Sequence, residues 1–91
     1  MGVFIRKKDV SPTVKELISD ASGYLLEDVH DNDVLTTDLR MDSLDKICLI
    51  MDCENHFNIR INDEDPELNT ILKEGTVKDF SDYITKLRKS C

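Results

Sequence analysis

Residues 36–57, TTDLRMDSLDKICLIMDCENHF, combine a helix start with a long apolar run of helical period. Asp42 is a residue type that caps helices well, and Asp45, three positions later, is placed to complete a capping box. Apolar residues then recur as far as Phe57 at the spacing of an α-helix. The stretch therefore predicts a helix that begins at Asp42 or Ser43 and ends near Phe57.

The predicted helix has two apolar faces. At about 100° per residue, one broad face, which we expect to pack against the core, holds Ile47, Leu49, Ile50, Cys53 and Phe57. The opposite side carries a narrower stripe, which consists of Leu44, Cys48 and Met51 and is flanked by Asp45, Asp52 and Glu54. A domain of this size cannot bury both faces of one helix, so we expect the narrow stripe to be exposed.

Two interpretations of this stripe remain open at the level of sequence. An exposed apolar surface rimmed by acids is typical of a site for protein partners. Alternatively, Leu44 and Met51 pack beneath the preceding loop, and the acids form an ordinary solvated face. Ser43 is equally ambiguous, since a serine in the first turn of a helix often only starts the helix. A phosphate ester on Ser43 would, however, lie at the positive end of the helix dipole.

The rest of the chain predicts three more helices and no convincing sheet. Ser11 as N-cap and Pro12 as the first helical residue start a helix over 12–22, which Gly23 ends. A short helix follows over 66–73, and Thr76 caps a last helix whose buried stripe is expected to be Val77, Phe80, Ile84 and Leu87. The predicted fold class is all-α, a small four-helix bundle with three longer helices and one short helix.

A long connection over 23–41 joins the first two predicted helices. A structureless loop of this length is unusual in a compact domain. We expect it to be held across the core by its apolar residues, which are Leu25, Leu26, Val29, Val34, Leu35 and Leu39.

Size and composition indicate one small domain over 1–91, with 1–9 as a loose basic tail. Aromatic residues make up only 5% of the 91 residues, so the core is expected to be mainly aliphatic. The net charge of −7 argues against nucleic acid or an anionic membrane as partner and favours proteins with basic surfaces. Three cysteines are too few for a disulfide framework, and no stretch is apolar enough to cross a membrane. We therefore expect a cytoplasmic monomer without stable membrane insertion.

Several short motifs together resemble the acyl carrier protein family. The resemblance rests on TDL at 37–39, DSL at 42–44 and the acidic helix that follows. It also includes Phe57, Ile59 and Ile61, and the closing segment TVKDFSDYI at 76–84. It runs from Ser11 to Leu87 and includes the order of three longer helices and one short helix.

The resemblance implies a carrier that catalyses nothing itself. Ser43 would receive 4′-phosphopantetheine from coenzyme A through a magnesium-dependent phosphopantetheinyl transferase. The thiol of that arm would carry acyl groups as thioesters between enzymes of fatty acid, polyketide or related lipid biosynthesis. The surface read by these basic partner enzymes would consist of Asp42, Leu44, Asp45, Met51, Asp52 and Glu54. A cavity for the acyl chain would be lined by Ile47, Ile50, Phe57, Leu68 and Ile71.

The chain departs from the family pattern at four residues and one segment. Cys48 and Asn55 stand where acids are common, and the stretch between Ile61 and Thr76 is several residues longer than in compact members. Arg40 stands where glycine is usual, two residues before Asp42. Lys46 falls toward the core face, near the expected mouth of the acyl cavity, where a small or apolar residue is usual. A lysine there would narrow the entrance, which favours short or polar acyl groups.

Other functions fit the sequence less well. An aminoacyl or peptidyl carrier and an unmodified acidic helical adaptor remain as alternatives. A serine hydrolase would need a histidine base beside Ser43, yet only His30 and His56 exist and no G-x-S-x-G motif is present. Cys53 and His56 could share a metal ion but lack further ligands at suitable spacing, so we expect no metal site.

Overall fold

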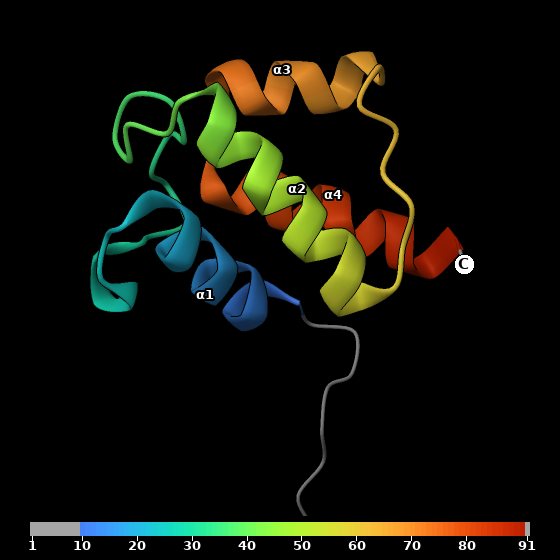
Figure 1. Cartoon of the computed structure of the whole chain (residues 1–91), viewed down its shortest axis with the longest axis horizontal. Coiled ribbons are helices and arrows are strands. Elements are labelled where there is room, and N and C mark those ends of the chain that lie inside the picture. Colours follow the sequence, from blue (N-terminus) through green and yellow to red (C-terminus); the bar gives the residue numbers. More distant parts are fainter. Residues whose placement is uncertain (1–9, 91) are drawn as a thin grey trace, which may run out of the picture.

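The computed structural model describes residues 10–90, and Figure 1 shows their arrangement. Its elements are α1 (Ser11–Ser22), the 3-10 helix η1 (Leu26–Asp28), α2 (Ser43–Phe57), α3 (Pro66–Glu74) and α4 (Val77–Ser90). These residues form no strand, and a single antiparallel bridge joins Val34 to Thr76. The prediction of an all-α bundle with three longer helices and one short helix is confirmed. The predicted tail over 1–9 lies outside the described residues.

Most helix ends coincide with the signals in the sequence. Gly23 ends α1 with a left-handed backbone (φ 84°), and its N–H donates to the carbonyl oxygen of Ser19 at 2.9 Å. Thr76 and Asp79 form a reciprocal capping box at the start of α4, in which each side chain accepts the backbone N–H of the other. The predicted N-cap of α1 was wrong by one position, because Ser11 is already helical and Val10 precedes it.

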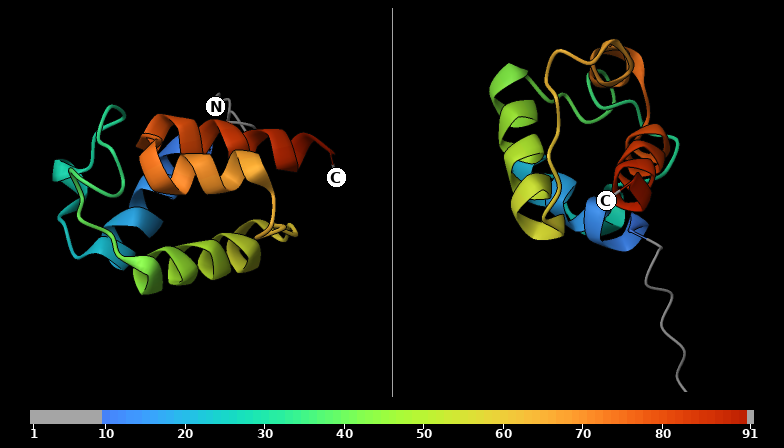
Figure 2. Two further views of the ribbon diagram at one scale, coloured as in Figure 1. Left: turned by 90° about the horizontal axis from the view of Figure 1, so that it is seen from above. Right: turned by 90° about the vertical axis from the view of Figure 1, so that its right-hand side faces the viewer.

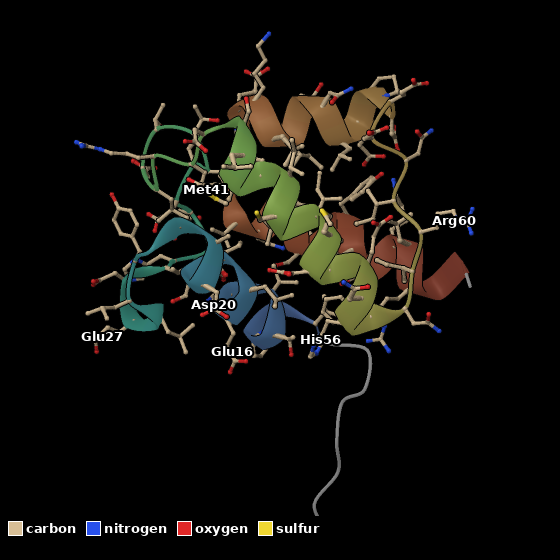
Figure 3. All side chains as sticks on the ribbon, viewed as in Figure 1. Glu16, Asp20, Glu27, Met41, His56 and Arg60 are labelled. Atoms are coloured by element: carbon tan, nitrogen blue, oxygen red, sulfur yellow. The ribbon has the colours of Figure 1, made fainter. Side chains whose placement is uncertain are left out.

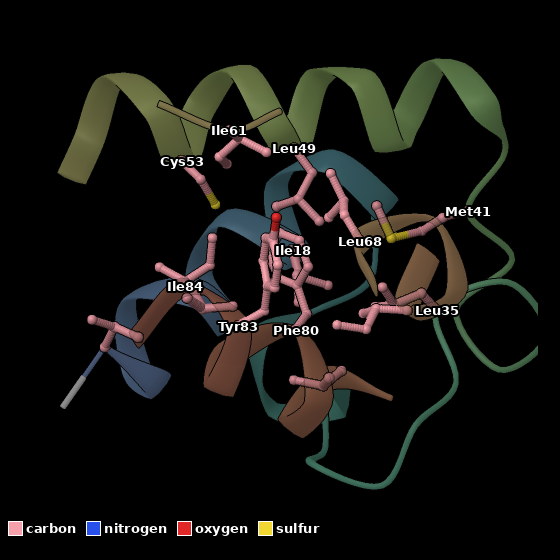
Figure 4. Close-up of a cluster of buried hydrophobic side chains, with 14 of the residues drawn as sticks. Ile18, Leu35, Met41, Leu49, Cys53, Ile61, Leu68, Phe80, Tyr83 and Ile84 are labelled. Atoms are coloured by element: carbon pink, nitrogen blue, oxygen red, sulfur yellow. The ribbon is translucent and has the colours of Figure 1, made fainter. Parts of the chain in front are cut away.

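The helices form two packed pairs that share one core. Helix α2 packs against α1, α3 packs against α4, and α1 also contacts α4. Figure 2 shows α3 running alongside α4, away from α1. Fully buried aliphatic and aromatic side chains from all four helices meet in the centre (Figure 4), among them Ile18, Leu49, Leu68, Phe80 and Ile84. The core is mainly aliphatic, as the composition predicted.

A hydrogen bond between side chains fixes α3 on α4. The phenol of Tyr83 donates to Oδ2 of Asp65 at 2.8 Å, while Oδ1 of Asp65 caps α3 by accepting the N–H of Glu67 at 3.0 Å. The bond from Tyr83 lowers the pKa of Asp65. Burial, together with this carboxylate, raises the pKa of Tyr83 above its ordinary value. The start of α3 is therefore tied to the middle of α4.

The long loop before α2 is held in place by its side chains and by its backbone. Val29, Leu35 and Leu39 are buried, as predicted. The loop also pairs with the α3–α4 junction, where Leu35 N–H donates to the carbonyl of Gly75 at 3.2 Å and Val77 N–H donates to that of Asp33 at 2.9 Å.

The prediction failed for two other apolar residues of this loop. Leu25 and Leu26 are 63% and 46% exposed, because the turn η1 directs them to solvent instead of the core. Val34 is half-buried. The loop is thus attached to the core through Val29, Leu35 and Leu39, while Leu25 and Leu26 point away from it.

Gly75, at the end of α3, offers a test of this packing. A Cβ added there would lie 2.7 Å from both the Cα and the carbonyl oxygen of Ile71, and backbone cannot yield as a flexible side chain can. We expect Gly75→Ala to lower the free energy of unfolding by about 1–3 kcal/mol, measured by denaturant unfolding. Lys73→Ala, on an exposed position of the same helix, should change it by less than about 0.5 kcal/mol. Equal effects of the two variants would contradict this account.

Candidate site at the start of helix α2

Ser43 is the first residue of α2 and is exposed. The residues on either side hold it there. Oδ1 of Asp42 accepts the N–H of Asp45 at 2.9 Å, and Oδ2 of Asp45 accepts the N–H of Asp42 at 3.3 Å. The predicted capping box is therefore present, and it determines that the hydroxyl of Ser43 stands at the mouth of the helix.

The local electrostatics at Ser43 suit a bound phosphate ester. The N-terminal turn of a helix presents backbone N–H groups and the positive end of the helix dipole. The carboxylates of Asp42 and Asp45 are turned back to the backbone by the capping box. A phosphate group esterified to Ser43 would thus lie near backbone N–H donors of the first helical turn. The hydroxyl of unmodified Ser43 is open to an incoming enzyme.

An apolar surface runs along α2 from Ser43. Leu44 is 67% exposed and Met51 is 55% exposed, so the predicted stripe does reach solvent, and Cys48 is also exposed. Ile47 was predicted for the core face, and that prediction was wrong, because its side chain is 53% exposed. The core contacts of α2 are made chiefly by Leu49 and Cys53, whose directions leave position 47 on the outer side of the helix.

The acids along α2 differ in what they do. Asp52 is exposed, and it directly follows Met51 on α2. Glu54 is half-buried, and its Oε2 accepts the backbone N–H of Ile61 at 2.9 Å. Glu54 thus fastens the loop that returns from α2 to α3. The sequence-based assignment of all these acids to a partner surface missed this contact.

The five residues predicted to line an acyl cavity lie in different environments. Ile47 and Ile50 line an open groove of about 560 Å³ between α2 and the returning loop. Leu68 and Ile71 are buried in the core. Phe57 is half-buried, with its ring against His56 and beneath the guanidinium of Arg88 at 5.5 Å.

The groove contains two of the five predicted residues, and the other three lie outside it. Its remaining lining is Met51, Glu54, Arg60, Ile61, Asn62 and Asp63. Figure 3 shows Arg60 on the returning loop, far from Met41 at the other end of α2.

Lys46 takes part in a chain of hydrogen bonds at the Ser43 end of α2. Its Nζ donates to Oγ1 of Thr36 at 2.8 Å, and that hydroxyl donates to the carbonyl oxygen of Leu72 at 2.9 Å. All three residues are half-buried. The chain joins the first turns of α2 to the last turn of α3 through the long loop, which the sequence did not reveal.

Comparison with known proteins agrees with this geometry. Residues 12–84 match the family model described as a phosphopantetheine attachment site. The chain is 38% identical over 81 residues to an acyl carrier protein of Chloroherpeton thalassium. The aligned region covers 89% of this chain and 95% of that protein. The chain is 36% identical over 78 residues to acyl carrier proteins of Chlorobium phaeovibrioides and Chlorobium luteolum, covering 86% of this chain and 94% of each relative.

The chain belongs to the acyl carrier protein family. A protein of this family holds 4′-phosphopantetheine as a covalent cofactor and carries acyl groups on it without catalysing a reaction. An exposed serine at the start of a helix fits that cofactor, because the attachment is a phosphate ester of a hydroxyl. Within residues 10–90, none of the helices has the length and apolar character that crossing a membrane requires.

Among residues 10–90, neither histidine lies where a serine hydrolase would need a base for Ser43. His56 lies nearly four turns further along α2, about 20 Å away at 1.5 Å per residue. His30 lies in the long loop, where its backbone N–H and its ring both face the carboxylate of Asp33.

The two described cysteines of the carrier differ in burial. Burial raises the pKa of the Cys53 thiol to about 12, and the charges of Asp52 and Glu54 add to this effect. Cys53 therefore stays protonated at neutral pH and is a core residue. Cys48 is a free cysteine on the exposed side of α2.

Arg40 has a left-handed backbone conformation in this carrier, with φ 53°. That conformation costs an L-residue about 1–2 kcal/mol, while glycine adopts it freely but loses more entropy on folding. The glycine that the resemblance leads us to expect at this position would adopt the turn before the capping box without this strain.

We expect Arg40→Gly to raise the free energy of unfolding by up to about 1 kcal/mol and Arg40→Val to lower it, because β-branched residues tolerate this conformation poorly. The measurement is denaturant unfolding followed by circular dichroism. Arg60→Gly serves as control, because Arg60 is also an exposed arginine but its φ is not positive. This control variant should be less stable than the native chain. If Arg40→Gly lost as much stability as the control, the backbone at Arg40 would not be strained.

Proposed function

We propose that Ser43 is the residue to which the 4′-phosphopantetheine arm is attached. Three observations support this proposal: the hydroxyl is exposed, it lies in the first turn of α2, and the capping box of Asp42 and Asp45 holds that turn. In the transfer, the Ser43 oxygen forms a bond to the phosphorus nearer the pantetheine of coenzyme A. The pyrophosphate bond breaks, the adenosine bisphosphate leaves, and a base of the transferase takes the hydroxyl proton.

The surface around Ser43 supports a role in binding partner enzymes. Leu44, Ile47 and Met51 supply an apolar centre, and Asp52 together with the capping acids supplies negative charge at its edge. Such a surface fits a phosphopantetheinyl transferase, and acyl-transfer and synthase enzymes, that present an apolar pocket with basic residues around it. The contribution of Glu54 is smaller, because one of its oxygens already binds the returning loop.

The cargo that we propose is an acyl intermediate of fatty acid, polyketide or related lipid biosynthesis. The relatives named as acyl carrier proteins support this choice over an aminoacyl or peptidyl carrier. The free thiols of Cys48 and Cys53 are consistent with action in the reducing cytoplasm. A monomer is the form that leaves the apolar surface beside Ser43 open to enzymes.

Attachment at Ser43 can be tested by intact-mass spectrometry. Incubation with coenzyme A, magnesium ions and a broad-specificity transferase should add one phosphopantetheine group to the native chain and none to Ser43→Ala. Circular dichroism should show unchanged helicity in the variant, since Asp42 still caps α2. Thr37→Ala, which removes an exposed hydroxyl of the neighbouring loop, should still be modified. Modification of Ser43→Ala would disprove the assignment.

Charge reversal tests the partner surface. Asp52→Lys should slow arm transfer by roughly 3–10-fold at low salt, and the difference should shrink as salt screens the exposed charges. Asp52 suits this test better than Asp45, whose carboxylate also caps the helix. Glu16→Lys makes the same change of charge on α1 and should have a smaller effect. If both reversals slowed transfer equally, only net charge would matter.

A further inference from the structure

Lys46 holds a positive charge that no carboxylate among residues 10–90 pairs with. Its Nζ donates to the neutral hydroxyl of Thr36 at 2.8 Å, which is its hydrogen bond in this part of the chain. The side chain of Lys46 is half-buried, whereas lysines in folded proteins are mostly exposed, and buried charges are usually paired. A cation in such a place is a ready partner for an anion.

The position of Lys46 on α2 directs its ammonium toward Ser43. Residues three apart on a helix have Cβ atoms roughly 5–6 Å from each other. A helical side chain also covers the turn on the N-terminal side of its own Cα. For Lys46 that turn is the one that Ser43 begins. A group esterified to Ser43 would therefore lie within reach of the ammonium.

The hydrogen bond to Thr36 prepares the ammonium for such a contact. A lysine ammonium has three N–H donors, and Thr36 accepts one of them. Thr36 is itself held, because its hydroxyl donates to the carbonyl oxygen of Leu72 at 2.9 Å. The ammonium is thus restrained while two of its donors remain for an anion, and less side-chain freedom is lost when the anion binds.

An arm on Ser43 would need a positive charge at this place. Its phosphate diester carries a negative charge, and Ser43 lies in the chain between the capping carboxylates of Asp42 and Asp45. Like charges at such short range repel each other. The whole chain already has a net charge of −7. A cation beside Ser43 would offset this repulsion where the arm is attached.

We propose that Lys46 binds the phosphate diester that joins the 4′-phosphopantetheine arm to Ser43, in an ammonium–phosphate ion pair that fixes the root of the arm on α2. The inference rests on the attachment at Ser43 proposed above. Lysine commonly binds phosphate groups as a point charge. Lys46 is a positioning residue in this role, because it holds the phosphate end of the arm and leaves the thiol end free.

Arg40 is the other cation close to Ser43 in the chain, three residues before it. Its side chain is exposed, whereas that of Lys46 is half-buried. Water and salt screen an exposed ion pair, and holding a long side chain in one geometry costs entropy. Lys46 is therefore the stronger candidate, and Arg40 is the rival that an experiment has to exclude.

Melting of the protein with and without its arm tests the ion pair without an enzyme assay. The native chain, Lys46→Gln, Arg40→Gln and Arg60→Gln are loaded from coenzyme A by the transferase, and intact mass confirms each product. Loading should change the melting temperature about 3–8 °C more favourably in the native chain than in Lys46→Gln, whose amide can still donate to Thr36. Arg60→Gln removes the same charge near the other end of α2 (Figure 3) and should behave like the native chain. Arg40→Gln should do so as well.

Two further measurements on the same samples report the contact directly. The phosphorus NMR resonance of the arm should lie at a different chemical shift in Lys46→Gln than in the native chain, and Arg60→Gln should match the native position. The difference in melting temperature between the native chain and Lys46→Gln should shrink as added sodium chloride screens the pair.

The outcomes separate the two proposals. Absence of a mass increase, or loading of Ser43→Ala, would overturn the attachment at Ser43 and with it the ion pair. Loading at Ser43 with equal effects in the native chain and Lys46→Gln would overturn the ion pair alone. Loss of the effect in Arg40→Gln instead would give the phosphate to the rival. If Lys46→Gln does not fold, the native protein decides, because the nitrogen resonance of the Lys46 ammonium must shift on loading and an unchanged resonance would rule the contact out.

Discussion

The capping box between Asp42 and Asp45 is the contact on which the carrier's arrangement depends. It ends the long loop and starts α2 at one defined residue, so the Ser43 hydroxyl stands in the first turn. The same helix turns Leu49 and Cys53 into the core. Because successive residues are 100° apart, these inward contacts also determine which side chains remain outside. The position of the proposed attachment site and the direction of the apolar surface therefore follow from one helix start and one packed face.

Two polar side chains of α2 hold the segments around it. Near its start, Lys46 reaches Thr36 of the long loop, and near its end, Glu54 reaches the N–H of Ile61 in the returning loop. Thr36 continues the first contact to the carbonyl of Leu72 in α3. These links connect α2 to segments that pack on other helices. They leave the outer face of α2 free for contacts with cargo or enzymes.

An exposed apolar face makes a small protein prone to self-association, and the net charge of this chain opposes that association. Leu44, Ile47 and Met51 are each more than half exposed on one side of a single helix. Surfaces of this kind promote association with other molecules. A net charge of −7 makes two copies of the chain repel one another and attracts basic partners instead. The combination suits the transient docking of basic enzymes that we propose for this surface.

The sequence by itself determined the four helices, nearly all of their ends, and the place of Ser43, because caps, prolines and glycines act through neighbours in the chain. Only the tertiary structure decided that Ile47 faces outward and that Lys46 and Glu54 are occupied by hydrogen bonds. It also separated Leu68 from the groove. The reason is that these outcomes depend on segments that folding brings together. Thr36, which joins Lys46 to α3, lies 10 residues before its lysine partner and 36 before its carbonyl partner, and no local pattern specifies such a meeting.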